Sequence, residues 1–198
     1  MASAPYEVQL AADVSVYYAP FGEEPPDVAA DADPATVGNW ALVADCEHIT
    51  EDGIVLRSNT QIQVIRSLCG INATKVSFTA KDLAFEFRVM DTRLAAVALA
   101  DGQDPATAVQ VDPAPNQNQL EFNSNPIPQG FSLLFRWGQS GYGDNMSSQI
   151  WLPSAVQSGD GGPTWSKTVP WGMAHLWTAL KTTGNPIGRF DEQTVAAT

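Results

Sequence analysis

Apolar and polar residues alternate along residues 54–66, and this pattern restricts the segment to a β-strand with one apolar face. Successive side chains of a strand point to opposite faces of its sheet, whereas a helix repeats every 3.6 residues. The polar row is rich in amides and hydroxyls and carries little charge, which favours a wall along a water-filled space. The apolar positions are Ile54, Leu56, Ile62 and Val64, and the polar positions are Arg57, Asn59, Gln61 and Gln63.

Other runs of β-branched and aromatic residues predict further strands. The Asp-Gly pair within residues 51–54 tolerates positive φ and predicts a hairpin turn between residues 40–49 and residues 54–66. Apolar residues change from even to odd positions at Lys81-Asp82, so residues 74–89 form either one bulged strand or two strands joined by a tight turn. The remaining predicted strands cover residues 14–19, 120–122, 131–137, 146–152 and 171–181.

A single segment has a convincing helical pattern. Asp91 is placed to cap residues 92–100, and Gly102 follows as a stop signal. The chain is therefore predicted to form one mainly β domain over residues 1–198, a β-sandwich or barrel-like fold with one flanking α-helix and long loops.

Long arms and loops accompany these elements, at residues 1–12, 20–39, 101–118 and 157–168. Residues 20–39 hold five acidic residues and four Pro, a composition that suits neither a helix nor a central strand. Such segments bury too little apolar surface to order alone, so we expect them to order against neighbouring copies of the chain. Deletion of residues 20–39 would then leave a folded domain that cannot assemble.

The charge of the chain is strongly negative and lies at one end. The net charge is −12, and residues 1–53 contain eleven acidic residues and no Lys or Arg. Affinity for nucleic acid comes mainly from Lys and Arg, so sequence-specific DNA binding is excluded. No apolar run approaches the roughly 18 residues that span a bilayer, and the first residues form no basic, hydrophobic leader. We expect no membrane partner and assembly in the host cytoplasm.

The chemistry-bearing residues indicate no enzyme. Motifs for Ser hydrolases, zinc proteases and nucleotide binding are absent, and only His48 and His175 could act as histidine bases or ligands. Cys46 and Cys69 lie far apart without a C-x-x-C pair. Carboxylate pairs for glycoside cleavage are unspecific in a chain with 22 acidic residues. We therefore predict no catalytic residue, no cofactor and no metal.

The order of several short motifs resembles that of the tail tube (major tail) proteins of long-tailed bacteriophages and related phage-like particles. An acidic Pro-rich loop, an amide-rich strand, a Phe-rich strand through Phe87 and a helix that ends at Gly102 follow one another in the same way. The resemblance continues over residues 149–156 and covers most of the chain. The motifs are Val16-Tyr17-Tyr18-Ala19-Pro20, Gly38-Asn39-Trp40-Ala41-Leu42-Val43 and Thr50-Glu51-Asp52-Gly53-Ile54.

The resemblance implies a structural virion protein of the phage tail. Copies of such a protein form hexameric rings that stack into a tube, with DNA as a non-specific cargo in transit and the tape measure protein in the lumen. An acidic surface would let DNA slide without being held. The candidate lumen-facing residues are Glu47, Glu51, Asp52, Arg57, Asn59, Gln61 and Gln63, and the candidate subunit-interface residues are Glu23, Glu24, Pro25, Pro26, Trp40, Trp165 and Trp171.

Two alternatives remain open from the residues alone. Exposed Trp rings stack on sugars, so a carbohydrate- or receptor-binding β-sandwich of a tail tip or surface protein is one. Trp165 and Trp171 lie among Gly, Pro and Ser and are the candidates for exposure, whereas Trp137, Trp151 and Trp177 lie in strand-like runs and suit a core. The other alternative is a different virion component, such as a tail terminator or a capsid decoration protein.

Overall fold

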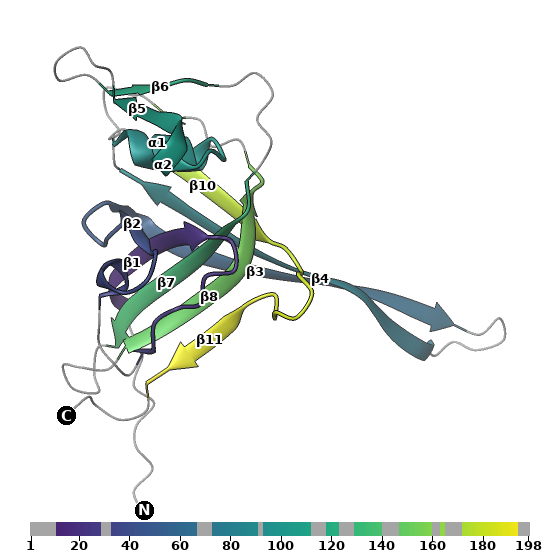
Figure 1. Ribbon diagram of the computed structural model, residues 1–198. Helices are drawn as coiled ribbons and strands as arrows, with labels where there is room; N and C mark the ends of the chain where they lie inside the picture. The colour runs from purple at the N-terminus through teal and green to yellow at the C-terminus, as the bar shows by residue number, and fades with distance from the viewer. Residues whose placement is uncertain are drawn as a thin grey trace, which may run out of the picture.

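One antiparallel sheet dominates the structure and curls into a nearly closed barrel (Figure 1). This computed structural model describes residues 11–28, 33–66, 73–90, 93–111, 118–122, 129–139, 147–159, 163–164 and 172–193. The strand order is β2-β1-β7-β8-β10-β4-β3, with β11 paired to β8 and β9 paired to β10. The strands are β1 (Ala11–Pro20), β2 (Ala41–Ala44), β3 (Ile49–Arg66), β4 (Ala73–Val89), β7 (Phe131–Gln139), β8 (Ser147–Gln157), β9 (Pro163–Thr164), β10 (Gly172–Ala179) and β11 (Arg189–Glu192).

The interior of the barrel is aromatic and aliphatic. The rings of Phe85 and Phe135 stack with their centroids 4.2 Å apart, and Trp177 meets Phe131 edge-on. These residues come from strands that are distant in the sequence, so the core joins both halves of the chain. The prediction of a mainly β fold with a barrel-like sheet is confirmed. The buried cluster also contains Val16, Val43, Ile49, Phe87, Val89, Leu99, Leu133, Leu152 and Ala155.

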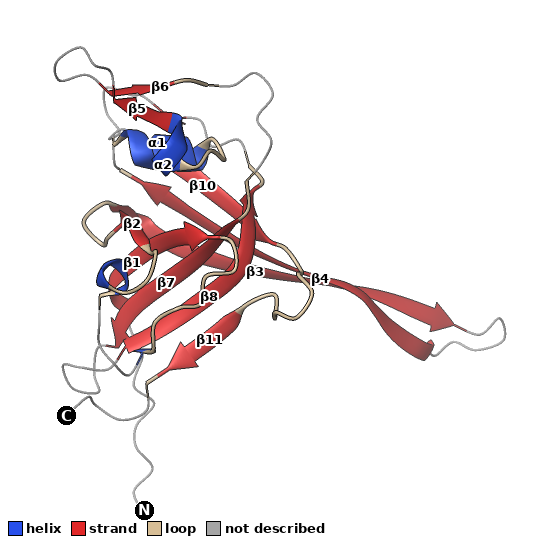
Figure 2. Cartoon of the chain, viewed as in Figure 1, coloured by secondary structure: helices blue, strands red, loops and turns tan. Residues whose placement is uncertain are grey.

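Two α-helices and a small second sheet lie at one end of the barrel (Figure 2). Helix α1 (Leu94–Ala100) packs Val97 and Ala100 against Met173 of β10, and Gly102, at φ 73°, lies just after its last turn. The predicted helix is thus confirmed for these residues, whereas Asp91 and Thr92 lie outside the described residues. The small sheet pairs β5 (Val109–Val111) with β6 (Asn118–Leu120).

Helix α2 (Pro105–Ala108) lies in a segment that we predicted to be a loop, residues 101–118. Its first turn is capped by Asp104, whose Oδ1 accepts a hydrogen bond from the backbone N–H of Ala106 at 3.0 Å. Asp followed by Pro is a helix-start signal, because Pro suits the first helical position. This local signal was therefore present and was missed.

The predicted hairpin turn at residues 51–54 is wrong. Residues 49–66 form one strand, and Gly53, at φ 67°, lies within it, where the register shifts between Ile49 and Ile54. An Asp-Gly pair suits a bulge as well as a turn, since both use positive φ. The chain turns earlier, where the backbone N–H groups of His48 and Ile49 both donate to the carbonyl oxygen of Asp45. Strand β3 consequently pairs with β4 and not with β2.

The phase change in residues 74–89 is a bulge. Gln61 pairs with Ala80, but the next residue, Ile62, pairs with Phe78, so Thr79 is the extra residue of a single strand, β4. Strand β10 pairs with β4 only from Ala84 onwards. Beyond that point β3 and β4 pair with each other and extend away from the barrel as a long hairpin (Figure 1).

Other boundaries differ from the prediction by a few residues. Strand β1 begins at Ala11, inside the predicted arm of residues 1–12, and ends at Pro20. A short 3-10 helix, η2 (Pro34–Thr36), interrupts the predicted loop of residues 20–39. Strands β5, β9 and β11 were not predicted, because runs of two to four residues are too short for a recognisable alternation.

Candidate functional site

Residues 20–28, which we call the strap, lie across the outside of the barrel and are held by buried side chains. The indole N–H groups of Trp40 and Trp151 donate to the carbonyl oxygens of Glu24 and Glu23, each at 3.0 Å. The Nε2 of Gln149 donates to the carbonyl oxygen of Pro26, also at 3.0 Å. Buried indole and amide donors need acceptors, and a Pro-containing segment outside any sheet has carbonyl groups to spare.

The strap is therefore part of the fold of a single chain. Trp40 and Trp151 are only 4% and 3% exposed, and Val28 is buried as well. The expectation that this loop orders only against neighbouring copies is wrong for its described residues. The deletion of residues 20–39 is now expected to destabilise the domain, because it would remove the acceptors of three buried donors.

The predicted subunit-interface residues differ in how far they are exposed in the single chain. Trp40 is buried in its own chain, which corrects its assignment to an interface. Glu23 is half-buried and its Oε1 accepts hydrogen bonds from the backbone and side-chain nitrogens of Asn39, at 3.3 and 3.4 Å. Glu24 is exposed, and Pro25 and Pro26 are half-buried. Trp165 and Trp171 lie outside the described residues.

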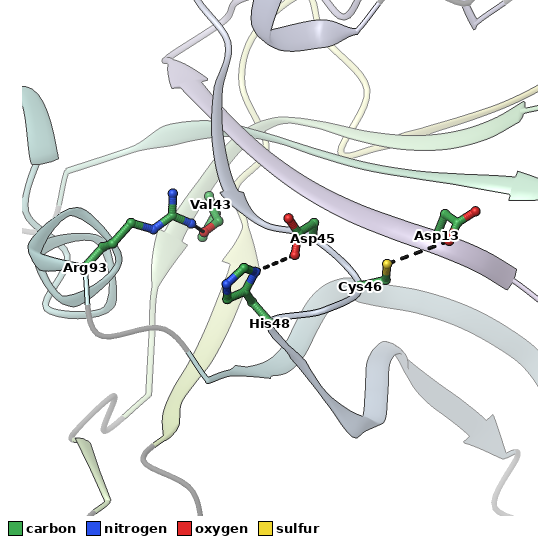
Figure 3. A network of polar contacts seen from close by, with 6 residues as sticks. All are labelled: Asp13, Val43, Asp45, Cys46, His48 and Arg93. Atoms are coloured by element: carbon green, nitrogen blue, oxygen red, sulfur yellow. Dashed lines mark hydrogen bonds and ion pairs between the residues drawn. The ribbon is translucent and has the colours of Figure 1, made fainter.

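The base of the hairpin is a tight turn with a polar contact (Figure 3). The Nδ1 of His48 lies 2.5 Å from the Oδ1 of Asp45. The backbone carbonyl oxygen of Asp45 accepts the two hydrogen bonds that form the turn. The carbonyl oxygen of His48 accepts a hydrogen bond from the backbone N–H of Met90, so the turn is joined to the end of β4. The hydrogen bond with His48 holds the pKa of Asp45 below its ordinary value.

Two further contacts lie beside this turn, one from the turn itself and one from β2 (Figure 3). The Sγ of Cys46 lies 3.7 Å from the Oδ1 of Asp13 in β1, and the guanidinium of Arg93 donates to the carbonyl oxygen of Val43 at 3.4 Å. Desolvation and the Asp13 carboxylate raise the pKa of the Cys46 thiol. A raised pKa keeps the thiol protonated, so Cys46 is a poor nucleophile. Cys69 lies outside the described residues.

Replacement of His48 by Ala is expected to raise the pKa of Asp45 toward 3.8, because its strongest hydrogen-bond partner is removed. Since the folded-state pKa of Asp45 is lowered, its contribution to stability is present above its ordinary pKa and is lost as the pH falls through the folded-state value. Both side chains are more than a third exposed, so the contribution is below about 1 kcal/mol. A carboxyl carbon NMR titration of the two proteins measures the shift, and an unchanged Asp45 pKa would contradict the contact.

The predicted lumen-facing residues all lie on β3 or in the turn before it. Glu47, Asp52 and Arg57 are exposed, and Arg57 forms an ion pair with Glu86 on the adjacent strand. The backbones of Glu51, Asn59, Gln61 and Gln63 belong to β3, but their side chains lie outside the described part. The structure therefore places these residues along one strand and the turn that precedes it.

The predicted apolar face of β3 is not covered where the hairpin leaves the barrel. Leu56, assigned to the dry row, is 46% exposed, and its neighbour Val55 is 43% exposed. Both residues lie on β3, the edge strand of the sheet, just before the point at which β3 and β4 extend beyond β10. The alternation thus correctly predicts a strand. The prediction that Leu56 is buried on its apolar face is wrong within the single chain.

The sequence predicts that His175 is an ordinary histidine of a strand, and the structure places it in β10 inside the barrel. His175 is fully buried, and its ring stacks on Phe87 of β4 with centroids 4.8 Å apart. Among the described residues, neither ring nitrogen has a hydrogen-bond partner. Burial alone lowers its pKa to about 3. Its position in an apolar strand, between Ala174 and Leu176, was the available signal.

The described residues hold no candidate metal centre. Their His, Cys, Asp and Glu side chains form no group of three that could hold a metal ion, and none of their helices is long and apolar enough to cross a bilayer. The features that remain are surfaces: the projecting hairpin, the acidic strap and the edge strand β11. No protein-family model matches this chain, and no curated protein matches it either.

Proposed function

We propose that this chain is a structural virion protein that assembles into stacked rings, in the manner of phage tail tube proteins, and forms a tube for DNA. The observation that carries the proposal is the projecting β3–β4 hairpin. Beyond Arg57 and Ala84 its two strands pair only with each other in the described residues, so each has an outer edge without a strand partner. Unpaired edges of this length attract pairing with other chains.

The exposed apolar residues of the hairpin support the same proposal. Val55 and Leu56 lie on opposite faces of β3, just before the projecting part begins, and both are more than two-fifths exposed. A stable monomer gains nothing from exposing apolar side chains on both faces of an edge strand, whereas a ring of identical copies would cover them. Assembly would be head-to-tail, closing around the ring and staying open along the tube axis.

The charge distribution supports a passive role toward DNA. Glu47 and Asp52 are exposed on or beside β3, and the chain as a whole carries a net charge of −12. A lumen lined by such residues repels phosphates and does not retain DNA. The partners in this proposal are identical copies, other tail proteins and the tape measure protein, and the location is the virion tail.

Shortening of the hairpin is expected to abolish assembly without unfolding the barrel. Arg57 and Ala84 are directly paired, so residues 58–83 can be replaced by Asn-Gly, which closes a two-residue hairpin. The pairing between β4 and β10 covers Ala84 to Val89 and is retained in full, so thermal unfolding should change little. Negative-stain electron microscopy of the purified proteins should show tubes or rings for the natural chain and none for the shortened one.

Two outcomes would contradict the proposed function. Tubes formed equally well by the shortened chain would exclude the hairpin as the assembly element. A natural chain that stays monomeric at high concentration with virion partners present, and that binds a glycan array, would favour the receptor-binding alternative. In the described residues Trp40, Trp151 and Trp177 are buried and Trp137 is half-buried, so no observation there favours a sugar platform.

A further inference from the structure

The two halves of strand β10 are held differently. Trp177 and Thr178, in the second half, pair with β8 on one side and with β4 on the other. In the first half, the described residues supply only the two-residue strand β9 on that first side, and its pairing ends at Met173. Ala174 and His175 therefore pair with β4 alone in the described part of the chain. The first half of β10 can separate from the sheet by breaking few backbone hydrogen bonds.

Helix α1 rests on this first half. Met173 is 1% exposed, and it packs against Val97 and Ala100 of the helix. Helix and strand lie together at one end of the barrel (Figure 1). A movement of the first half of β10 would therefore loosen α1 as well, and we call the two segments together, residues 94–100 and 172–175, the joint.

Buried polar groups without partners gather beside the joint. His175 is fully buried, and its ring lies parallel to that of Phe87, with an interplanar angle of 1°. Gln157 is directly paired with Trp177, so both side chains are on the inner face of the sheet. In the described residues, the carboxamide of Gln157, the indole N–H of Trp177 and both ring nitrogens of His175 have no hydrogen-bond partner. Unsatisfied groups of this kind make the closed state costly at this end of the barrel.

We propose that the joint is an acid-sensitive conformational device, which opens when His175 binds a proton while the rest of the barrel stays folded. The partly paired half-strand, the helix that rests on it and the buried imidazole carry the inference. It does not depend on the proposed assembly, because all of these contacts lie within one chain.

The closed joint offers a protonated imidazole nothing to pair with. The charged neighbours of Phe87 on β4 are Glu86 and Arg88, and successive residues of a strand point to opposite faces, so both point away from the His175 ring. Glu86 is moreover engaged by Arg57. Helix α1 contains no titratable side chain. The residues that surround Phe87 from β3 and β7 are apolar, namely Ile54 and Phe135.

The sign of the effect follows from this burial. Burial lowers the pKa of His175 from 6.5 to about 3 in the closed state, whereas an opened joint exposes the ring to water. The open state therefore binds a proton below pH 6.5 and the closed state does not. The ratio of open to closed molecules should rise by about thirtyfold between pH 7.5 and 5.

Hydrogen exchange of the natural protein in low urea concentrations tests whether this opening is local. After correction for the intrinsic rates, the backbone amides of the joint should exchange about thirtyfold faster at pH 5 than at pH 7.5. Their exchange should depend little on urea, because a local opening exposes little surface. The amides of residues 132–136 in β7 should show the full urea dependence of global unfolding. Joint amides that follow the urea dependence of β7 at pH 5 would overturn the inference.

Two variants identify the proton-binding group. In His175→Phe the acid response of the joint should disappear, because the ring still stacks on Phe87 and no longer titrates. The matched control is His48→Ala, which removes the partly exposed histidine and should keep the natural response. An acid response that persists in His175→Phe would exclude His175 as the trigger.

Oxidation of Met173 gives a second readout in the natural chain, so the test does not require that the variant folds. Dilute peroxide converts an accessible methionine to its sulfoxide, and Met173 becomes accessible only when the joint opens. Its oxidation rate, followed by peptide mass spectrometry, should rise by about tenfold per pH unit below 6.5. A rate that stays constant between pH 7.5 and 5 would overturn the inference.

Discussion

Replacement of Trp151 by Ala is expected to lower the free energy of unfolding by about 3–5 kcal/mol. The indole is 3% exposed and packs with Tyr17, Trp40 and Leu134, so its removal leaves a large cavity. The same change removes the donor that holds the carbonyl oxygen of Glu23. Natural domains are stable by only about 5–15 kcal/mol, so a large part of the stability would be lost. Urea unfolding monitored by circular dichroism measures the difference.

Trp137 offers a matched control for this prediction. It is also a Trp of a central strand, but it is half-buried and contacts Phe190 at the surface instead of the strap. Replacement of Trp137 by Ala should therefore cost clearly less than replacement of Trp151. Equal costs for the two variants would show that the strap contributes little to the stability of the barrel. Deletion of the strap itself is expected to act in the same direction as Trp151→Ala, since it removes acceptors from Trp40, Trp151 and Gln149.

Acid is expected to destabilise the barrel through His175. Burial lowers the pKa of this side chain to about 3 in the folded state, whereas the unfolded chain has the ordinary value of 6.5. The unfolded state therefore binds a proton between these two values and the folded state does not. Stability from the neutral ring is fully present above pH 6.5 and is lost as the pH falls below it, by about 1.4 kcal/mol per pH unit. Between pH 6.5 and 5 this amounts to about 2 kcal/mol.

The variant His175→Phe isolates this effect from that of the carboxylates. Phe fills a similar volume, suits the stack on Phe87 and has no titratable group. The free energy of unfolding of the variant should fall less between pH 7.5 and 5 than that of the natural chain, by about 2 kcal/mol. A control at His48, which is partly exposed, should leave the natural pH dependence largely intact. The same pH dependence in natural and His175→Phe proteins would contradict the proposed burial of a neutral imidazole.

Local sequence patterns predicted much of the secondary structure. The strand residues around Phe85, Leu133 and Trp151 and the helix before Gly102 were found because periodicity and capping depend on neighbours in the sequence. The phase change near Lys81 located the bulge in β4 to within a few residues. It could not distinguish a bulge from a turn, because both shift the alternation by one residue.

Contacts between distant segments were beyond such patterns. The Asp-Gly pair at residues 52–53 suits a turn and a bulge equally, and only the pairing of β3 with β4 decides between them. The strap has the composition of a disordered loop, yet Trp151, more than 120 positions later, donates to its backbone. Likewise, nothing next to His175 in the sequence indicates that both of its ring nitrogens are buried with no partner among the described residues.

The amino-acid sequence by itself determined a mainly β domain with one clear helix and an acidic N-terminal quarter, because these properties belong to short segments or to composition. Only the tertiary structure decided that the strap is held against the outside of the barrel by buried donors, that Trp40 is buried and that the hairpin extends beyond the barrel. The physical reason is that burial and strand pairing depend on which segments meet in space. These contacts between distant segments are set by the packing of the whole barrel and not by any single stretch of the chain.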